Sequence, residues 1–184
     1  MYITGVDFTK VRTATEGAEF HLGSLGANAG VSSMYTAPMT TTGTTAGTNG
    51  GPKIYRYVKF GTGGVAVGQA VIINPATEVA TAITTTLAAP AAGQGFPVGV
   101  AVAAGAVNGF GWVQVYGRTV VNSANSTAIG TRLATSATAG QLATGVGATT
   151  AQLVNGIVLT TAGATTGSAA NLNWPEVGIA GAAN

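Results

Sequence analysis

The chain offers few residues for acid–base or nucleophilic chemistry. His21 is its one histidine and Asp7 its one aspartate, so a Ser-His-Asp set would need both, with a serine such as Ser24. The segment Gly23-Ser24-Leu25-Gly26 does not have the nucleophile-elbow pattern. Catalysis generally needs several titratable groups with tuned pKa values in one pocket. We therefore predict a non-enzymatic protein with no catalytic residues.

Metal and cofactor sites have equally little support. One histidine and no cysteine exclude the usual zinc sites, and Glu16 with Glu19 do not make a calcium loop. Gly61-Thr62-Gly63-Gly64 resembles a phosphate-binding loop, but Ala66 stands where the third glycine would be. A strand-like segment follows this loop, whereas phosphate binding needs a helix N-terminus. We predict a turn there, and no metal or cofactor.

Basic residues next to aromatic ones can bind nucleic acid, and Tyr55-Arg56-Tyr57-Val58-Lys59 has that local pattern. The segment is isolated, however, and the net charge of +2 rests on 7 basic and 5 acidic residues. Nucleic-acid binding requires a clustered basic surface. We expect a strand with one polar face and no nucleic-acid partner. Five basic residues do lie in the first third of the chain: Lys10, Arg12, Lys53, Arg56 and Lys59.

The scarcity of charge is the strongest compositional signal. Charged residues make up 7% of the chain, compared with about 25% in ordinary soluble domains. Weakly charged surfaces associate, and free strand edges pair with other chains. We expect copies of the chain or a partner to cover much of the surface; a neutral-surfaced monomer is the alternative. The absence of cysteine fits assembly in a reducing cytoplasm, and no signal-peptide layout or membrane-length apolar run is present.

The elements that would position these residues are strands. Dense β-branched and aromatic runs at 54–60, 98–102 and 112–116, with shorter runs between and after them, alternate with glycine-rich turns. Asn108-Gly109 favours a tight hairpin turn. No segment has a capped helical period. We predict an all-β fold, a small barrel or sandwich, with four valines in its core: Val98, Val100, Val113 and Val115.

Two regions differ in composition. Residues 1–51 read as an N-terminal arm with a Gly/Thr-rich loop, which is either disordered or ordered on a partner. Residues 52–184 read as the β-domain. Within it, segments of about 65–121 and 127–176 resemble each other, with Val67-Gly68-Gln69 matching Ile129-Gly130-Thr131 and Trp112 matching Trp174. This pattern suggests an internal duplication.

Several of these segments together resemble the head decoration (cement) proteins of tailed bacteriophages. The resemblance lies in Phe20-His21-Leu22-Gly23, in 54–59 and 67–71, and in Val98 to Ala101 leading to Gly111-Trp112-Val113-Gln114-Val115-Tyr116-Gly117. It covers 54–121 well and 129–174 loosely, and the insertion between Gly26 and Gly51 departs from the family's compact form.

The resemblance implies a virion protein on the capsid exterior, assembled in the host cytoplasm. It would bind the major capsid protein and copies of itself, often as a homotrimer, and clamp neighbouring capsomers without enzymatic activity or a membrane. The basic first third would face an acidic capsid. The residues expected at the partner interface are Lys10, Arg12, Phe20, Tyr55, Arg56 and Tyr57.

Two other classes share this composition. One is another virion subunit, from a tail or fibre. The other is a neutral-surfaced polysaccharide- or ice-binding β-protein, for which Trp112, Trp174 and Tyr116 are the aromatic candidates. The threonine runs at 40–42 and 84–86 lack the regular period of ice-binding proteins.

Overall fold

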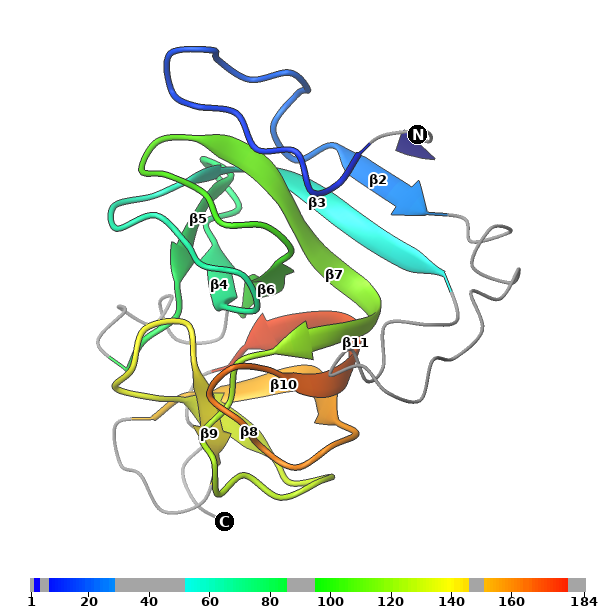
Figure 1. Ribbon diagram of the computed structural model, residues 1–184, viewed down its shortest axis with the longest axis vertical. Helices are drawn as coiled ribbons and strands as arrows, with labels where there is room; N and C mark the ends of the chain where they lie inside the picture. The colour runs from blue at the N-terminus through cyan, green and yellow to red at the C-terminus, as the bar shows by residue number, and fades with distance from the viewer. Residues whose placement is uncertain (1, 4–6, 29–51, 86–94, 146–150, 179–184) are drawn as a thin grey trace.

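The computed structural model describes residues 2–3, 7–28, 52–85, 95–145 and 151–178 (Figure 1). These residues form eleven strands and no helix, which confirms the all-β prediction. The strands are β1 (Tyr2–Ile3), β2 (Leu25–Asn28), β3 (Lys53–Phe60), β4 (Ala70–Ile73), β5 (Val79–Ala82), β6 (Phe96–Ala101), β7 (Phe110–Val121), β8 (Leu133–Thr135), β9 (Leu142–Thr144), β10 (Leu153–Leu159) and β11 (Ser168–Val177).

Strands β3 to β7 pair in a closed ring. β3 pairs with β5, β5 with β4, β4 with β6, β6 with β7, and β7 returns to β3. Every pair is antiparallel except β3–β5. Side chains from all five strands meet in one apolar cluster, whose buried members are Val58, Phe60, Val65, Val71, Ile73, Ala80, Ala101, Val113 and Val115. Ring closure gives each of these strands a neighbour on both sides.

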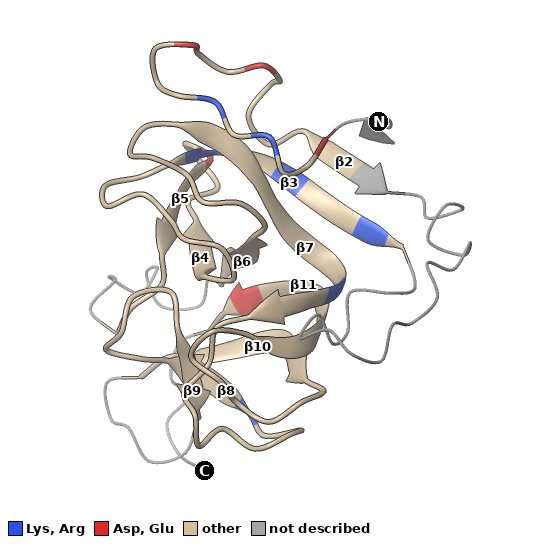
Figure 2. Ribbon diagram, in the orientation of Figure 1, with Lys and Arg blue, Asp and Glu red and all other residues tan. Residues whose placement is uncertain are grey.

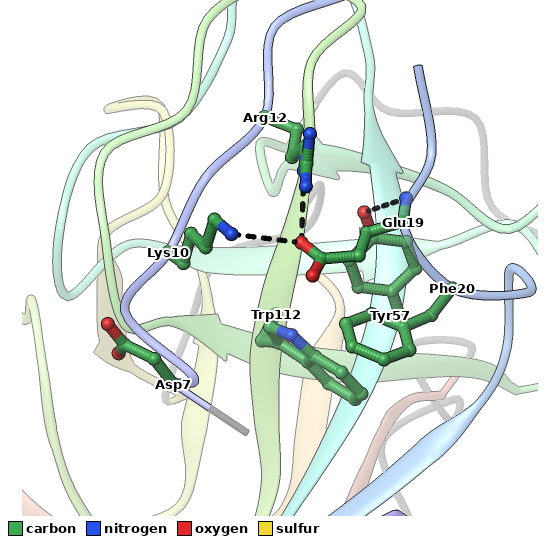
Figure 3. Close-up of a pocket in the computed structure, with 7 residues that line it drawn as sticks. All are labelled: Asp7, Lys10, Arg12, Glu19, Phe20, Tyr57 and Trp112. Carbon is green, nitrogen blue, oxygen red and sulfur yellow. Dashed lines mark hydrogen bonds and ion pairs between the residues drawn. The ribbon is translucent and has the colours of Figure 1, made fainter. Parts of the chain in front are cut away.

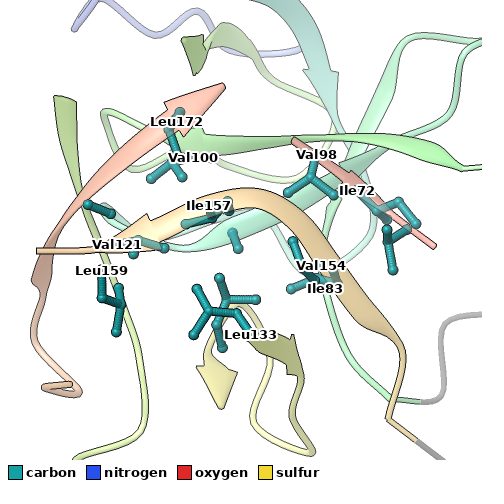
Figure 4. Close-up of a cluster of buried hydrophobic side chains, with 14 residues drawn as sticks. Ile72, Ile83, Val98, Val100, Val121, Leu133, Val154, Ile157, Leu159 and Leu172 are labelled. Carbon is teal, nitrogen blue, oxygen red and sulfur yellow. The ribbon is translucent and has the colours of Figure 1, made fainter. Parts of the chain in front are cut away.

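A second layer of strands continues from β7. The C-terminal half of β7 pairs with β11, followed in order by β10, β8 and β9. A second apolar cluster joins this layer to β4 and β6, through Ile72, Val98 and Val100 (Figure 4). Strands β4 and β6 are therefore apolar on both faces, because one face of each strand packs in the first cluster and the other face packs in the second. The predicted core valines, Val98, Val100, Val113 and Val115, are all buried.

The two halves of the β-domain pair their strands in the same order. The strand order β5-β4-β6-β7 is followed by β11-β10-β8-β9, which is the same order mirrored about the β7–β11 pair. Val71 of β4 pairs with Ala82, the last residue of β5, and Leu133 of β8 pairs with Thr144, the last residue of β9. Val71 and Leu133 therefore hold equivalent positions, 62 residues apart. The same offset of 62 positions relates Gly68 to Gly130 and Glu78 to Gly140, and all four have positive φ.

The N-terminal segment does not behave as the predicted free arm in its described part. β2 pairs antiparallel with β3, and the backbone of Arg12 exchanges hydrogen bonds of 2.8 Å with that of Phe110 on β7. Residues 7–22 thus lie over the face of β3 and β7 that points away from the ring, and β2 extends the sheet beside β3 (Figure 1). The Gly/Thr-rich loop at 29–51 lies outside the described residues.

Candidate partner-binding surfaces

An aromatic cluster holds the N-terminal segment in place. Phe8 stacks on Tyr55 with ring centroids 4.1 Å apart, and Phe20 meets Tyr57 edge-on at 5.3 Å. Both phenylalanines also contact the ring of Trp112, at 5.1 Å and 5.3 Å. Such pairs contribute beyond their buried area. Trp112 is consequently 2% exposed, although it lies on the outer face of β7.

Tyr55 and Tyr57, which the sequence analysis expects at a partner interface, are covered by residues of their own chain. Their exposed fractions are 7% and 2%, because Phe8 and Phe20 cover them. Burial raises the pKa of the Tyr55 hydroxyl, while the Tyr57 hydroxyl accepts a 3.0 Å hydrogen bond from the backbone of Glu19. Tyr55 and Tyr57 lie on the face of β3 opposite Val58, whose side chain belongs to the apolar cluster of the ring. The sequence does not show that a distant segment of the same chain covers the two tyrosines.

A pocket of about 210 Å³ lies at the edge of this cluster (Figure 3). Its floor is aromatic, and Lys10, Arg12 and Glu19 stand over it. Arg12 Nε donates to Glu19 Oε2 at 2.9 Å, and Lys10 Nζ lies 3.4 Å from the same oxygen. The Arg12 hydrogen bond lowers the pKa of Glu19, and Glu19 raises that of Arg12.

The anions of this segment outnumber its cations. Residues 7–19 carry two cations, Lys10 and Arg12, and three anions, Asp7, Glu16 and Glu19. Hydrogen bonds from Thr13 lower the pKa of Glu16, so the carboxyl group stays ionised. The expected cationic surface at Lys10 and Arg12 is therefore neutralised by neighbours from the same segment.

Arg56, the remaining predicted interface residue, is bound to its own chain. Its guanidinium donates two hydrogen bonds to the Glu78 carboxylate, one of them from Nε to Oε2 at 2.8 Å. Both side chains are mostly buried, at 22% and 16% exposed. Bidentate pairs of this kind have fixed geometry. Arg56 thus joins β3 to the turn before β5 and leaves only its outer edge for a partner.

A second pocket, of about 180 Å³, lies between Arg56 of β3 and the C-terminal end of β11. It is lined by Arg56, Gly95, Pro97, Val98, Val115, Trp174, Pro175 and Glu176. Trp174 is 48% exposed and has a φ of 48°, a backbone conformation that bulky residues rarely adopt. The sequence pairs Trp174 with Trp112 by position, but it gives no sign that one is exposed and the other buried.

Asp7, one of the residues that an acid–base set would need, makes local hydrogen bonds. Asp7 Oδ1 accepts hydrogen bonds from the backbone and hydroxyl of Thr9, at 2.9 Å and 2.6 Å. His21 is exposed in a turn whose carbonyl accepts the backbone N–H of Ser24 at 3.0 Å. Within the described ranges, no three His, Asp or Glu residues gather as metal ligands would. The same ranges contain no helix that is long and apolar enough to span a membrane.

Comparison of the chain with protein-family models, curated proteins and solved structures found no match.

Proposed function

We propose that this protein is a non-enzymatic capsid decoration protein, which binds the outside of a phage head and stabilises contacts between capsomers. One observation carries the proposal: the near absence of charge over a large all-β surface. Residues 119–178 contain two charged residues, Arg132 and Glu176. Figure 2 draws charge around the N-terminal segment, β3 and β5, while the ribbon around β8, β9 and β10 is almost entirely uncharged. A surface of this kind favours a covered state over a free one.

The exposed apolar side chains support the same region as the contact surface. Among the described residues, five large hydrophobic side chains are exposed, and three of them, Ile129, Val158 and Trp174, belong to the C-terminal half. Scattered exposed aliphatic residues are normal on a soluble protein. Here they lie within residues 119–178, where Arg132 and Glu176 are the only charged residues. The proposed capsid-facing or copy-facing surface is therefore the β8–β11 half.

This placement revises the interface expected from the sequence. Lys10, Arg12 and Phe20 contact their own chain, as do Tyr55, Arg56 and Tyr57. Their proposed role is to fix the N-terminal segment and β3, so that the β-domain presents a rigid surface. Rigid, preorganised surfaces lose less conformational entropy on binding.

The mechanism is mass action. A protein that binds the assembled shell and not its free subunits stabilises the shell according to its concentration and affinity. Contacts repeated by symmetry across many capsomer seams add avidity to a modest individual affinity. A homotrimer on a local three-fold axis would place three such contacts at one point.

Co-sedimentation tests the proposal. The purified protein would be mixed with assembled empty heads of the phage that encodes it, and separately with unassembled capsid subunits. The proposal predicts saturable binding to heads at a fixed stoichiometry and none to subunits. Equal binding to subunits, or no binding to heads, would contradict it. Sedimentation velocity of the protein alone reports whether it is a trimer before it binds.

A further inference from the structure

The backbone of β11 has an unusual conformation at the Trp174 pocket. Trp174 and Glu176 are two positions apart on β11, and both line the pocket. The strand is distorted opposite Gly156, where the β10–β11 register shifts. A Cβ on Gly156 would lie 2.6 Å from the carbonyl oxygen of Asn173, so glycine is required for this approach. Backbone strain of this kind costs about 1–3 kcal/mol and concentrates at functional sites.

The aromatic part of the site is a pair of rings. The Tyr116 ring lies 6.3 Å from that of Trp174, with an angle of 40° between the ring planes. The exposed indole is therefore supported on one side by its own chain. The faces of Trp and Tyr rings attract cations.

The lining of the pocket carries one cation, Arg56, and one anion, Glu176. Arg56 and Glu78 neutralise each other, whereas no donor or cation among the described residues pairs with the Glu176 carboxylate. That carboxylate lies over Gly95, where an added Cβ would be 2.9 Å from Oε2. An exposed carboxylate without a partner among the described residues, next to the Trp174 and Tyr116 rings, is complementary to a cation and opposed to an anion.

The first half of the β-domain contains a tryptophan, Trp112, that matches Trp174 by position. The 62-position offset that relates β4 and β5 to β8 and β9 also separates Trp112 from Trp174. Trp112 is covered by the N-terminal segment, which brings Phe20 and the cations Lys10 and Arg12 over it. Trp174 has no such cover among the described residues and remains 48% exposed.

We propose that the Trp174 pocket binds a lysine or arginine side chain from the protein that this chain decorates, with the alkyl stem on the indole and the charged head at Glu176. The identity of the partner rests on the proposed function, while the cation specificity of the pocket does not. The pocket's volume of about 180 Å³ fits one side chain and is smaller than the usual pocket for a drug-sized ligand.

The test uses small probes and the full chain. The indole N–H of Trp174 would be followed by NMR during titration with Nα-acetyl-lysine N-methylamide, with Trp112 as the internal reference. The matched probe is Nα-acetyl-norleucine N-methylamide, which has an apolar side chain in place of the ammonium. Methyl glucoside tests a sugar as the alternative ligand. We expect the Trp174 signal to shift while that of Trp112 does not, and the lysine probe to bind about threefold to tenfold more tightly than norleucine.

Variants separate the charge from the ring. Glu176→Gln is expected to reduce the affinity for the lysine probe to that for norleucine, and Glu16→Gln, an exposed acid on the N-terminal segment, to leave it unchanged. Trp174→Leu, followed through the backbone amide of Gly95, is expected to abolish binding of both probes. Equal affinity for lysine and norleucine, preferential binding of the glucoside, or an unchanged affinity in Glu176→Gln would overturn the proposal.

Binding to heads distinguishes the two proposals. If Trp174→Leu and Glu176→Gln bind heads as tightly as the unaltered chain, the pocket is not the docking site and the decoration function stands. If the unaltered chain does not bind heads, the decoration function fails, and the probe titration still decides whether the pocket is selective for cations.

Discussion

The docking of the N-terminal segment onto β3 and β7 can be tested with Phe8→Ala and Phe20→Ala. Truncating a fully buried Phe costs about 3–5 kcal/mol, and the half-buried Phe8 and Phe20 should each lose about half of that. Both rings contact Trp112, so their effects overlap and do not add. We expect the double variant to lower the free energy of unfolding by about 2–4 kcal/mol.

The assay combines urea unfolding with tryptophan quenching. In a Trp174→Phe background, Trp112 is the only tryptophan and is 2% exposed, so acrylamide should quench it poorly. Removing both phenylalanines should expose it and raise quenching several-fold. Val158→Ala, at a side chain that is 51% exposed, is the control and should change stability by less than about 0.5 kcal/mol. If the double variant has unaltered stability and Trp112 stays protected, residues 7–22 do not pack as described.

Three further predictions follow from local geometry. Glu78→Gln removes one partner of the mostly buried pair with Arg56 and should cost about 1–3 kcal/mol in urea unfolding; an unchanged midpoint would show that the pair contributes nothing. The pKa values of Glu16 and Glu19 are lowered in the folded protein. Their contribution to the free energy of unfolding is therefore fully present above the ordinary Glu pKa of about 4.3, and it is lost as the pH falls through the lowered pKa values. Trp112 quenching should therefore rise below about pH 4, less so in Glu19→Gln, and a flat profile would contradict the role of these carboxylates. Gly105→Ala would place a Cβ 2.2 Å from the ring of the buried Phe60 and should cost about 1–3 kcal/mol, whereas Gly178→Ala, with its nearest contact at 3.4 Å, should be nearly neutral by thermal unfolding.

The local features of the fold were accessible from the sequence. Dense runs of β-branched and aromatic residues located β3, β6 and β7, and the four valines predicted for the core are buried. These features depend on neighbours within a few residues, which a single sequence shows directly. The tight hairpin turn predicted at Asn108-Gly109 is not formed by that pair: the Gly109 N–H donates to the Ala106 carbonyl at 3.0 Å, so Val107 and Asn108 are the central residues, and Asn108 alone of the pair has a positive φ, of 60°.

Features that depend on distant contacts were not accessible. Phe8 and Phe20 appeared to belong to a free arm, because nothing near them in sequence reveals the face of β3 that they cover. Arg56 finds Glu78 through a parallel pairing of β3 with β5, which no local pattern specifies. Trp174 is exposed at an irregularity of β11 opposite Gly156, which its match to Trp112 by position does not reveal.

Thermal rupture of phage heads tests the central claim most directly. Heads stripped of decoration would be heated with increasing amounts of the purified protein, and release of DNA would be followed by dye fluorescence. The account predicts that the rupture temperature rises with protein concentration and reaches a plateau when the head sites are saturated. A protein that saturates the heads without raising the rupture temperature would contradict the stabilising role, even though it binds.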